Sequence, residues 1–260
     1  MLIVDNLEFH YKNSTVLSNV NLCITQPGVY FIIGPNGVGK TTLLQCIDRQ
    51  LIPTKGSILI DNQNILKINR NDFSKIVGYV PQIAFESFPT RVVDSVLLGR
   101  YPYSKYGYDK NDLDITFEAL SDMDILDYSN RYTNELSTGQ LQKVHIARGM
   151  VQQTRILLLD EPTSNLDIKH QISVFQSLKK LSSLRKMIII VVCHDINLAA
   201  TFSDILIVMR DGSIYAEGKP SEIITNNLMK DVYGIDCYIQ SYNNKPYILY
   251  SEYGVELNID

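Results

Sequence analysis

A glycine-rich loop followed by lysine and threonine constrains this chain more than any other stretch. The loop matches the pattern G-x-x-x-x-G-K-[ST] and reads Gly34-Pro35-Asn36-Gly37-Val38-Gly39-Lys40-Thr41-Thr42. The apolar run 29–33 before it predicts a strand, and 43–47 after it predicts a helix. In that context, backbone amides and a helix N-terminus can cradle phosphate, Lys40 can reach the β- and γ-phosphates, and the Thr41 hydroxyl can ligate Mg²⁺. The loop therefore predicts a nucleoside triphosphate site rather than a glycine-rich turn without a ligand.

Composition narrows the class of protein. The chain has 260 residues, of which 45% are hydrophobic and 20% charged, as expected for one large α/β domain or a core with a small lobe. A formal charge of −4 predicts no nucleic-acid partner. The longest apolar run, 187–193, is far shorter than the ~20 residues of a membrane helix, and no signal peptide is expected. Four scattered cysteines indicate neither a zinc site nor a disulfide framework, which fits a reducing cytosol.

Apolar periodicity predicts two kinds of β-structure. Apolar and polar residues alternate in parts of 2–24 and again at 58–60, which predicts an antiparallel portion beside the loop. After residue 155 the apolar runs are unbroken, as in strands covered on both faces, and helical stretches separate them. This order predicts a parallel sheet. The runs are 156–159, 187–193 and 205–209, with helices at about 168–184 and 195–202.

The middle of the chain has a different pattern. Residues 83–150 lack such runs but carry apolar residues at helical spacing, which predicts a mostly helical insert. The tyrosine-rich patch 101–108 predicts a surface loop. We therefore expect an α/β fold in which 1–82 and 151–210 form the core, 83–150 a helical subdomain, and 211–260 a C-terminal β/α extension.

Two adjacent carboxylates follow the apolar run 156–159. Asp160 would face the phosphate loop from the end of its strand, because ligands gather at that edge of α/β sheets, and it could hold Mg²⁺ through water. Glu161 is placed to activate a water molecule that attacks the γ-phosphate. The alternative is a strand that ends in an acidic turn without function.

A third motif, Leu136-Ser137-Thr138-Gly139-Gln140, begins a strongly predicted helix. Ser137 is a good N-cap, and Gly139 allows a backbone amide to approach an anion. A capped helix without a ligand is the alternative. The three motifs together, in this order and spacing, resemble the ATPase subunit of an ABC transporter over essentially the whole chain.

The resemblance implies roles for the motif residues and for further ones. It places nucleotide contacts on 34–42, Ser137, Gly139 and Gln140, and adenine stacking on Tyr11. Gln82 matches the glutamine that senses Mg²⁺ and the attacking water, the stretch 164–167 matches the loop that crosses the dimer interface, and His194 matches the histidine that contacts the γ-phosphate. The implied catalytic residues are Lys40, Gln82, Glu161 and His194, and the implied metal contacts are Thr41, Gln82 and Asp160. Thr138 departs from the usual glycine, and we expect it to tune the site modestly.

Two stretches with less specific sequence patterns than the phosphate motifs suggest a subfamily. The segment 88–102 and the end of the chain, including 232–236, are similar to ATPases of importers for iron-siderophore, haem, cobalamin and other metal chelates. The resemblance implies ATP and Mg²⁺ as ligands and a second copy of the chain in a head-to-tail dimer. It further implies permease subunits, indirect contact with a solute-binding protein, and a place on the cytoplasmic face of the cell membrane.

Several alternatives remain open from the sequence. An ATPase of another ABC importer class or of an exporter is the strongest competitor. An ABC ATPase acting on DNA or the ribosome would carry a long coiled coil or two ATPase domains, and a GTPase would carry an N-K-x-D stretch; neither is present. A regulatory subunit that binds ATP without hydrolysis is disfavoured because Glu161 and His194 are both present.

Overall fold

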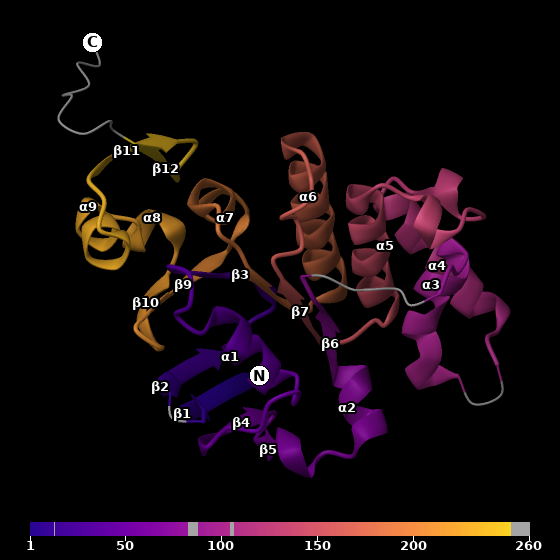
Figure 1. The fold of residues 1–260 in the computed structure, drawn as a ribbon, viewed down its shortest axis with the longest axis horizontal. Helices are drawn as coiled ribbons and strands as arrows, with labels where there is room; N and C mark the ends of the chain where they lie inside the picture. Colours follow the sequence, from indigo (N-terminus) through magenta and orange to yellow (C-terminus); the bar gives the residue numbers. More distant parts are fainter. Residues whose placement is uncertain (13, 83–87, 105–106, 251–260) are drawn as a thin grey trace.

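A four-stranded antiparallel sheet and a six-stranded mixed sheet form the centre of the fold (Figure 1). The structure is a computed structural model, and it describes residues 1–12, 14–82, 88–104 and 107–250. The antiparallel sheet has the order β2-β1-β4-β5, which confirms the β portion predicted beside the loop. Its strands are β1 (Leu2–Tyr11), β2 (Ser14–Ile24), β4 (Lys55–Ile60) and β5 (Gln63–Asn64).

The six-stranded sheet has the order β10-β9-β3-β8-β7-β6. Five strands are parallel, and β10 pairs antiparallel with β9 at one edge. All residues of β7 and β8 are buried, as the unbroken apolar runs 156–159 and 187–193 predicted, and those of β3 are buried as well. The strands are β3 (Gly28–Ile33), β6 (Val77–Val80), β7 (Ile156–Asp160), β8 (Ile188–Val192), β9 (Ile205–Arg210) and β10 (Ser213–Gly218).

Helices cover the sheets and fill the middle of the chain. The segment predicted as a helical insert contains α3 (Val92–Leu97), η2 (Leu98–Tyr103), α4 (Lys110–Asp122), η3 (Leu126–Tyr128), η4 (Thr133–Glu135) and α5 (Thr138–Val151). The first half of the chain adds α1 (Lys40–Ile47), η1 (Ile65–Lys67) and α2 (Arg70–Ile76), and the second half α6 (Ile168–Arg185) and α7 (Ile196–Phe202). Residues 101–103 of the tyrosine-rich patch thus belong to the 3₁₀-helix η2 rather than to a loop, and the Arg100 side chain just before them is buried. Residues 105–106 of the patch lie outside the described residues.

The C-terminal part of the chain folds beside α7. It consists of α8 (Pro220–Ile223), α9 (Asn226–Leu228), the short π-helix η5 (Met229–Tyr233) and the hairpin of β11 (Cys237–Tyr242) and β12 (Lys245–Tyr250). The Asn197 side chain of α7 exchanges two hydrogen bonds with the Ile248 backbone and fastens the hairpin. Strand β10 belongs to the six-stranded sheet, although it lies in the stretch predicted as the C-terminal extension. The division of the chain into a core, a helical subdomain and an extension stays a prediction.

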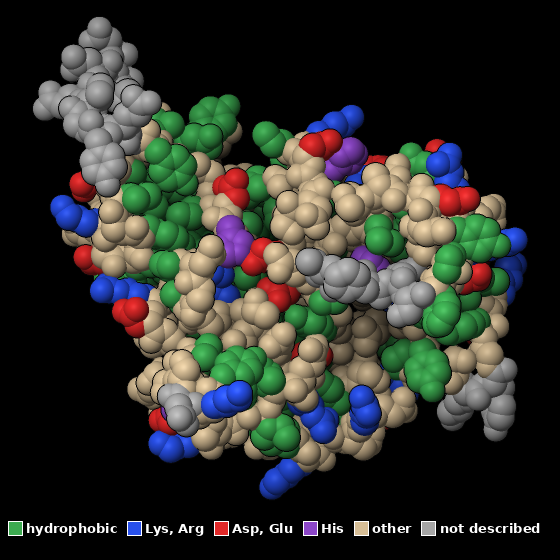
Figure 2. Space-filling model, in the orientation of Figure 1, with side chains coloured by type: hydrophobic (Ala, Val, Ile, Leu, Met, Phe, Trp, Pro, Cys, Tyr) green, Lys and Arg blue, Asp and Glu red, His purple; other side chains and the backbone are tan. Residues whose placement is uncertain are grey.

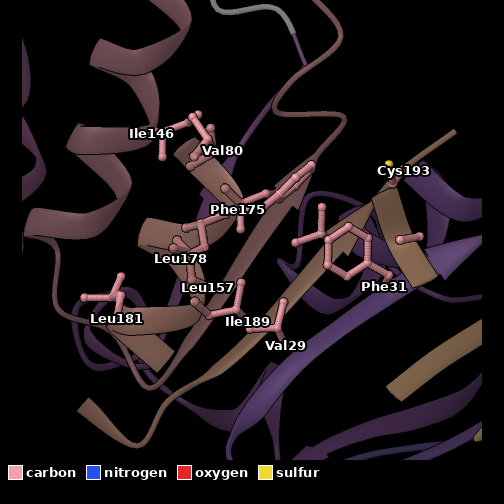
Figure 3. Packing of buried hydrophobic residues seen from close by; sticks show 14 of the residues in the cluster. Val29, Phe31, Val80, Ile146, Leu157, Phe175, Leu178, Leu181, Ile189 and Cys193 are labelled. Atoms are coloured by element: carbon pink, nitrogen blue, oxygen red, sulfur yellow. The ribbon is translucent and has the colours of Figure 1, made fainter. Parts of the chain in front are cut away.

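Two hydrophobic clusters lie on the two faces of the six-stranded sheet. One packs β3, β7 and β8 against α6, where the rings of Phe31 and Phe175 are 5.2 Å apart (Figure 3). The other lies between the two sheets and includes Leu43 and Leu44 of α1. Each fully buried aliphatic or aromatic side chain stabilises the fold by roughly 1.5–3 kcal/mol. The rigid sheet brings the carboxyl ends of β3, β6, β7 and β8 to one edge, and the functional residues follow those ends.

Candidate nucleotide site

Lys40 begins α1, and its side chain folds back over the loop before it. Its Nζ donates to the carbonyl oxygens of Gly34 and Pro35, each over 2.7 Å, and the residue is 5% exposed. Burial lowers the pKa of Lys40, and the negative charges of Glu161 and Asp160 act in the opposite direction. The loop thus holds a cation at the N-terminus of a helix, which is a suitable site for phosphate oxygens.

Gly34 fixes the path of the loop where it leaves β3. Its φ is +148°, and a Cβ at this position would lie 2.3 Å from the Met209 carbonyl oxygen of β9. Backbone of a central strand cannot move aside, so only glycine fits here. The phosphate loop therefore begins in close contact with the six-stranded sheet, at the carboxyl end of β3.

Asp160 at the end of β7 is held from two sides. Its Oδ1 accepts from the Thr41 hydroxyl over 2.9 Å, and its Oδ2 accepts from the Tyr79 hydroxyl over 3.3 Å. The residue is 3% exposed. Burial raises the pKa of Asp160, although these two hydrogen bonds favour its ionised form. The structure brings Asp160 and Thr41 together as the sequence predicted.

Glu161 lies one residue beyond the strand, with its carboxylate between two polar side chains. Gln82 donates to Oε2 over 2.6 Å, and the His194 Nε2 contacts Oε1. Its φ of +47° is uncommon for a residue with a side chain, and its amide donates to the Val192 carbonyl of β8 over 3.1 Å. This turn directs Asp160 and Glu161 to different partners although they are adjacent in sequence.

One cavity of about 480 Å³ joins the loop to these side chains. A volume of this size is typical of small-molecule sites. Its lining consists of Val16, Asn36, Gly37, Gly39, Lys40, Thr41, Thr42, Gln82, Glu161 and His194. Nine of these ten residues were predicted from sequence, and Val16 of β2 was missed because nothing in its alternating pattern marks it.

The predicted signature residues lie elsewhere. Ser137 caps α5 by accepting from the Gln140 amide over 3.3 Å, while the Gln140 side chain accepts from the Ser137 amide over 3.0 Å. A Cβ at Gly139 would lie 3.1 Å from Cδ2 of Leu166, so this glycine lets the loop 164–167 approach the helix. Both segments line a second cavity of about 380 Å³. Within one chain, the signature residues and the phosphate loop are therefore not parts of the same cavity.

Tyr11 is also absent from the lining of the 480 Å³ cavity. It ends β1, is 47% exposed, and packs edge to face against Phe9 with ring centroids 4.8 Å apart. Tyr79 was not predicted from sequence as a site residue. Its only signal was its place on an apolar strand just before Gln82, and its contact with Asp160 depends on β6 lying next to β7.

Residues 17–164 match the family model described as ABC transporter. The chain belongs to the ABC transporter ATPase family. The family confirms the fold class and the ATPase activity predicted from the three motifs. In this ABC ATPase no helix of the described residues is both long and apolar enough to cross a membrane.

Relatives of this ABC ATPase extend over almost its whole length. An uncharacterized ABC transporter ATP-binding protein of Methanocaldococcus jannaschii is 46% identical over 96% of this chain and 97% of its own. The petrobactin import ATP-binding protein FpuD of Bacillus anthracis is 35% identical over 90% of this chain and 87% of its own. The ferric enterobactin transport ATP-binding protein FepC of Escherichia coli is 34% identical over 90% and 88%. The predicted similarity to metal-chelate importer ATPases is confirmed.

Solved structures agree on the fold. A chain of an inward-facing ABC transporter assigned to the metal-chelate type superposes with a TM-score of 0.82 at 24% identity, over 96% of this chain and 97% of that one. An ATP-binding cassette in a dimeric post-hydrolysis state bound to ADP and Pi has a TM-score of 0.76 at 31% identity, over 84% and 98%. The described architecture is therefore that of an ABC cassette.

Proposed function

We propose that this ABC ATPase binds and hydrolyses ATP to drive import of a metal chelate, such as an iron-siderophore, haem or cobalamin. The observation that carries the hydrolytic part is the grouping of Gln82, Glu161 and His194 beside Lys40 in one cavity. The choice of cargo rests on the relatives, of which one is for petrobactin import and one for ferric enterobactin transport.

In the proposed mechanism each side chain acts on the triphosphate or on water. Lys40 exchanges its two carbonyl partners for β- and γ-phosphate oxygens and neutralises their charge. Glu161 accepts a proton from the attacking water, which Gln82 helps to orient. His194 donates to the γ-phosphate and holds Glu161 in position before nucleotide arrives. Tyr11 offers its exposed ring to the adenine, as expected for a base-stacking residue.

Mg²⁺ fits the oxygen donors at Asp160 and Thr41. A buried carboxylate and a hydroxyl 2.9 Å apart are hard ligands, and Mg²⁺ is commonly held by one or two carboxylates together with substrate phosphates. Gln82 would complete the protein contacts. When bound, the metal neutralises charge on the β- and γ-phosphates.

The separate position of the signature residues supports a dimer. Ser137, Gly139 and Gln140 do not line the cavity of their own loop, so they are available to the nucleotide of a second copy. Two copies arranged head to tail would then form two composite sites, with the γ-phosphate as the ligand that favours the closed state. The dimeric cassette bound to ADP and Pi is a structural precedent.

The helical segment is the proposed contact with permease subunits. Figure 2 shows hydrophobic side chains along its outer side, at the right of the view. Tyr101 is 73% exposed and Leu98 51%, and both line an apolar groove of about 350 Å³ between η2 and α5. A permease at this surface would hold the ATPase on the cytoplasmic face of the membrane, and a solute-binding protein would deliver cargo from the other side.

A reconstitution experiment tests the proposed function. The chain is purified with a permease that copurifies with it, placed in liposomes, and supplied with a ⁵⁵Fe-siderophore and its binding protein. We expect uptake that requires ATP inside the liposome and disappears in Glu161→Gln. ATP hydrolysis without uptake of any tested iron chelate would reject the cargo, and export of substrate would reject the direction of transport.

A further inference from the structure

The Asp160 carboxylate is fixed by donors from two different elements. Thr41 of α1 holds Oδ1 and Tyr79 of β6 holds Oδ2. We propose that Tyr79 is a positioning residue, which sets the rotation of the Asp160 carboxylate so that Oδ1 faces Thr41 and the phosphate loop. The inference rests on the proposed Mg²⁺ site, because that is where this orientation would matter.

The geometry makes Tyr79 the donor in this contact. Burial raises the pKa of Tyr79, so the phenol keeps its proton at neutral pH, and an ionised carboxylate only accepts. The Gln45 side chain, one turn beyond Thr41 on α1, acts in the opposite direction on this pKa.

Gln82, on the same segment as Tyr79, also donates a hydrogen bond to a carboxylate at the end of β7. Strand β6 pairs in parallel with β7, in a register that places Tyr79 beside Leu158, two residues before Asp160. Three residues after Tyr79, Gln82 donates to Glu161. One segment therefore provides a donor to each of the two adjacent carboxylates. Since Asp160 is 3% exposed, water cannot readily replace the phenol if it is removed.

The decisive variant is Tyr79→Phe, which removes one hydroxyl and keeps the ring. Tyr30→Phe is a matched control, because Tyr30 lies on β3 of the same sheet and donates its hydroxyl to the Gln26 carbonyl over 2.9 Å, away from the site. The ATP Kd of each full-length protein is measured by calorimetry in EDTA and at stepwise MgCl₂ concentrations. This readout is binding, so it does not depend on turnover.

We expect Tyr79→Phe to bind ATP in EDTA as wild type does, but to need about 10-fold more Mg²⁺ for half of the Mg²⁺-dependent tightening, as is typical when a residue behind a metal ligand is lost. Tyr30→Phe should keep the wild-type Mg²⁺ curve.

The outcomes separate this inference from the proposed site. A wild-type protein whose ATP affinity does not respond to Mg²⁺ would reject the metal site and the inference together. A normal wild-type response with the same Mg²⁺ curve in Tyr79→Phe would reject the inference alone. An equal loss of thermal stability in both tyrosine variants, without a shift in the curve, would assign Tyr79 a structural role and also reject it.

Discussion

The Arg100 guanidinium and the Asp112 carboxylate form an ion pair inside the helical segment, with Nε 2.8 Å from Oδ1 and less than a tenth of each side chain exposed. Nη1 of Arg100 also donates to the Val151 carbonyl over 2.9 Å. Burial opposes ionisation, but the bonds from Arg100 and the Asp109 backbone hold the pKa of Asp112 below its ordinary value. The pair joins η2 to α4 and to the end of α5.

Removing one partner of this pair should be costly. Arg100→Leu leaves a buried carboxylate uncompensated, and we expect the free energy of unfolding to fall by about 3–5 kcal/mol in urea denaturation. The double variant with Asp112→Leu should recover much of the loss, because no unpaired charge remains. Lys180→Ala breaks a largely exposed pair with Asp122 and should change stability by less than about 1 kcal/mol. An equal loss in Arg100→Leu and Lys180→Ala would contradict the assignment.

Asp48, at the C-terminal end of α1, should make stability depend on pH. Burial raises the pKa of Asp48 to about 6, although Gln50 donates to it over 2.8 Å. Because the folded pKa is above the unfolded one, the group's stabilising contribution is complete below about pH 4 and is lost as pH rises through 6. Asp48→Asn should therefore raise the free energy of unfolding by about 1–3 kcal/mol at pH 8 and by roughly a third as much at pH 4.5.

Urea denaturation at pH 4.5, 6 and 8 measures this gain. Asp114→Asn on the exposed side of α4 is the control, and its effect should not vary in the same way. A gain in Asp48→Asn that is largest at pH 4.5 would show that the carboxyl is stabilised in its ionised form, contrary to the expected sign.

Glu161→Gln should separate binding from hydrolysis. The amide keeps the size of the side chain but cannot accept a proton from water, so phosphate release should fall by about 10²–10⁴-fold. The ATP Kd should change little, because Lys40 and the loop amides are untouched. Glu118→Gln on the exposed face of α4 is a matched control. Wild-type phosphate release from the Glu161 variant would remove this residue from the proposed role.

Tyr11→Ala should weaken ATP binding. Loss of a stacking contact of about 1–3 kcal/mol corresponds to a Kd raised by about 5–150-fold, whereas Tyr11→Phe keeps the ring and should bind nearly as wild type. Turnover at saturating ATP should hold. Tyr242→Ala on β11 removes a more exposed tyrosine and serves as the control. Unchanged affinity in Tyr11→Ala would exclude adenine stacking.

Much of the cavity could be predicted because its residues lie in contiguous motifs. The stretch 34–42 and the pair Asp160 and Glu161 each combine a strand end with the chemistry that follows it. The order of strands could not be predicted in the same way. The apolar run 29–33 predicts a strand, but it does not say that β8 and β9 are the neighbours of β3.

The contacts missed from sequence share one cause. Strand β6 has four residues, including Gly78, and its stability comes from pairing with β7 rather than from local preference. Tyr79 reaches Asp160 only because of that pairing. Likewise Gly139 was predicted for its amide, while the closeness of Leu166 follows from how α5 and the loop 164–167 meet in space.

The meeting of Gly139 and Leu166 has a consequence for a working dimer. Leu166 lies five residues after Glu161 on the same chain, while Gly139 is proposed to serve the nucleotide of the other copy. Cleavage of the γ-phosphate beside Glu161 would then affect the nucleotide at the second site through the contact between Leu166 and Gly139 of the same subunit. Hydrolysis at the two sites of such a dimer would be coupled. The hydrolysis rate would then depend on ATP concentration with a Hill coefficient above one.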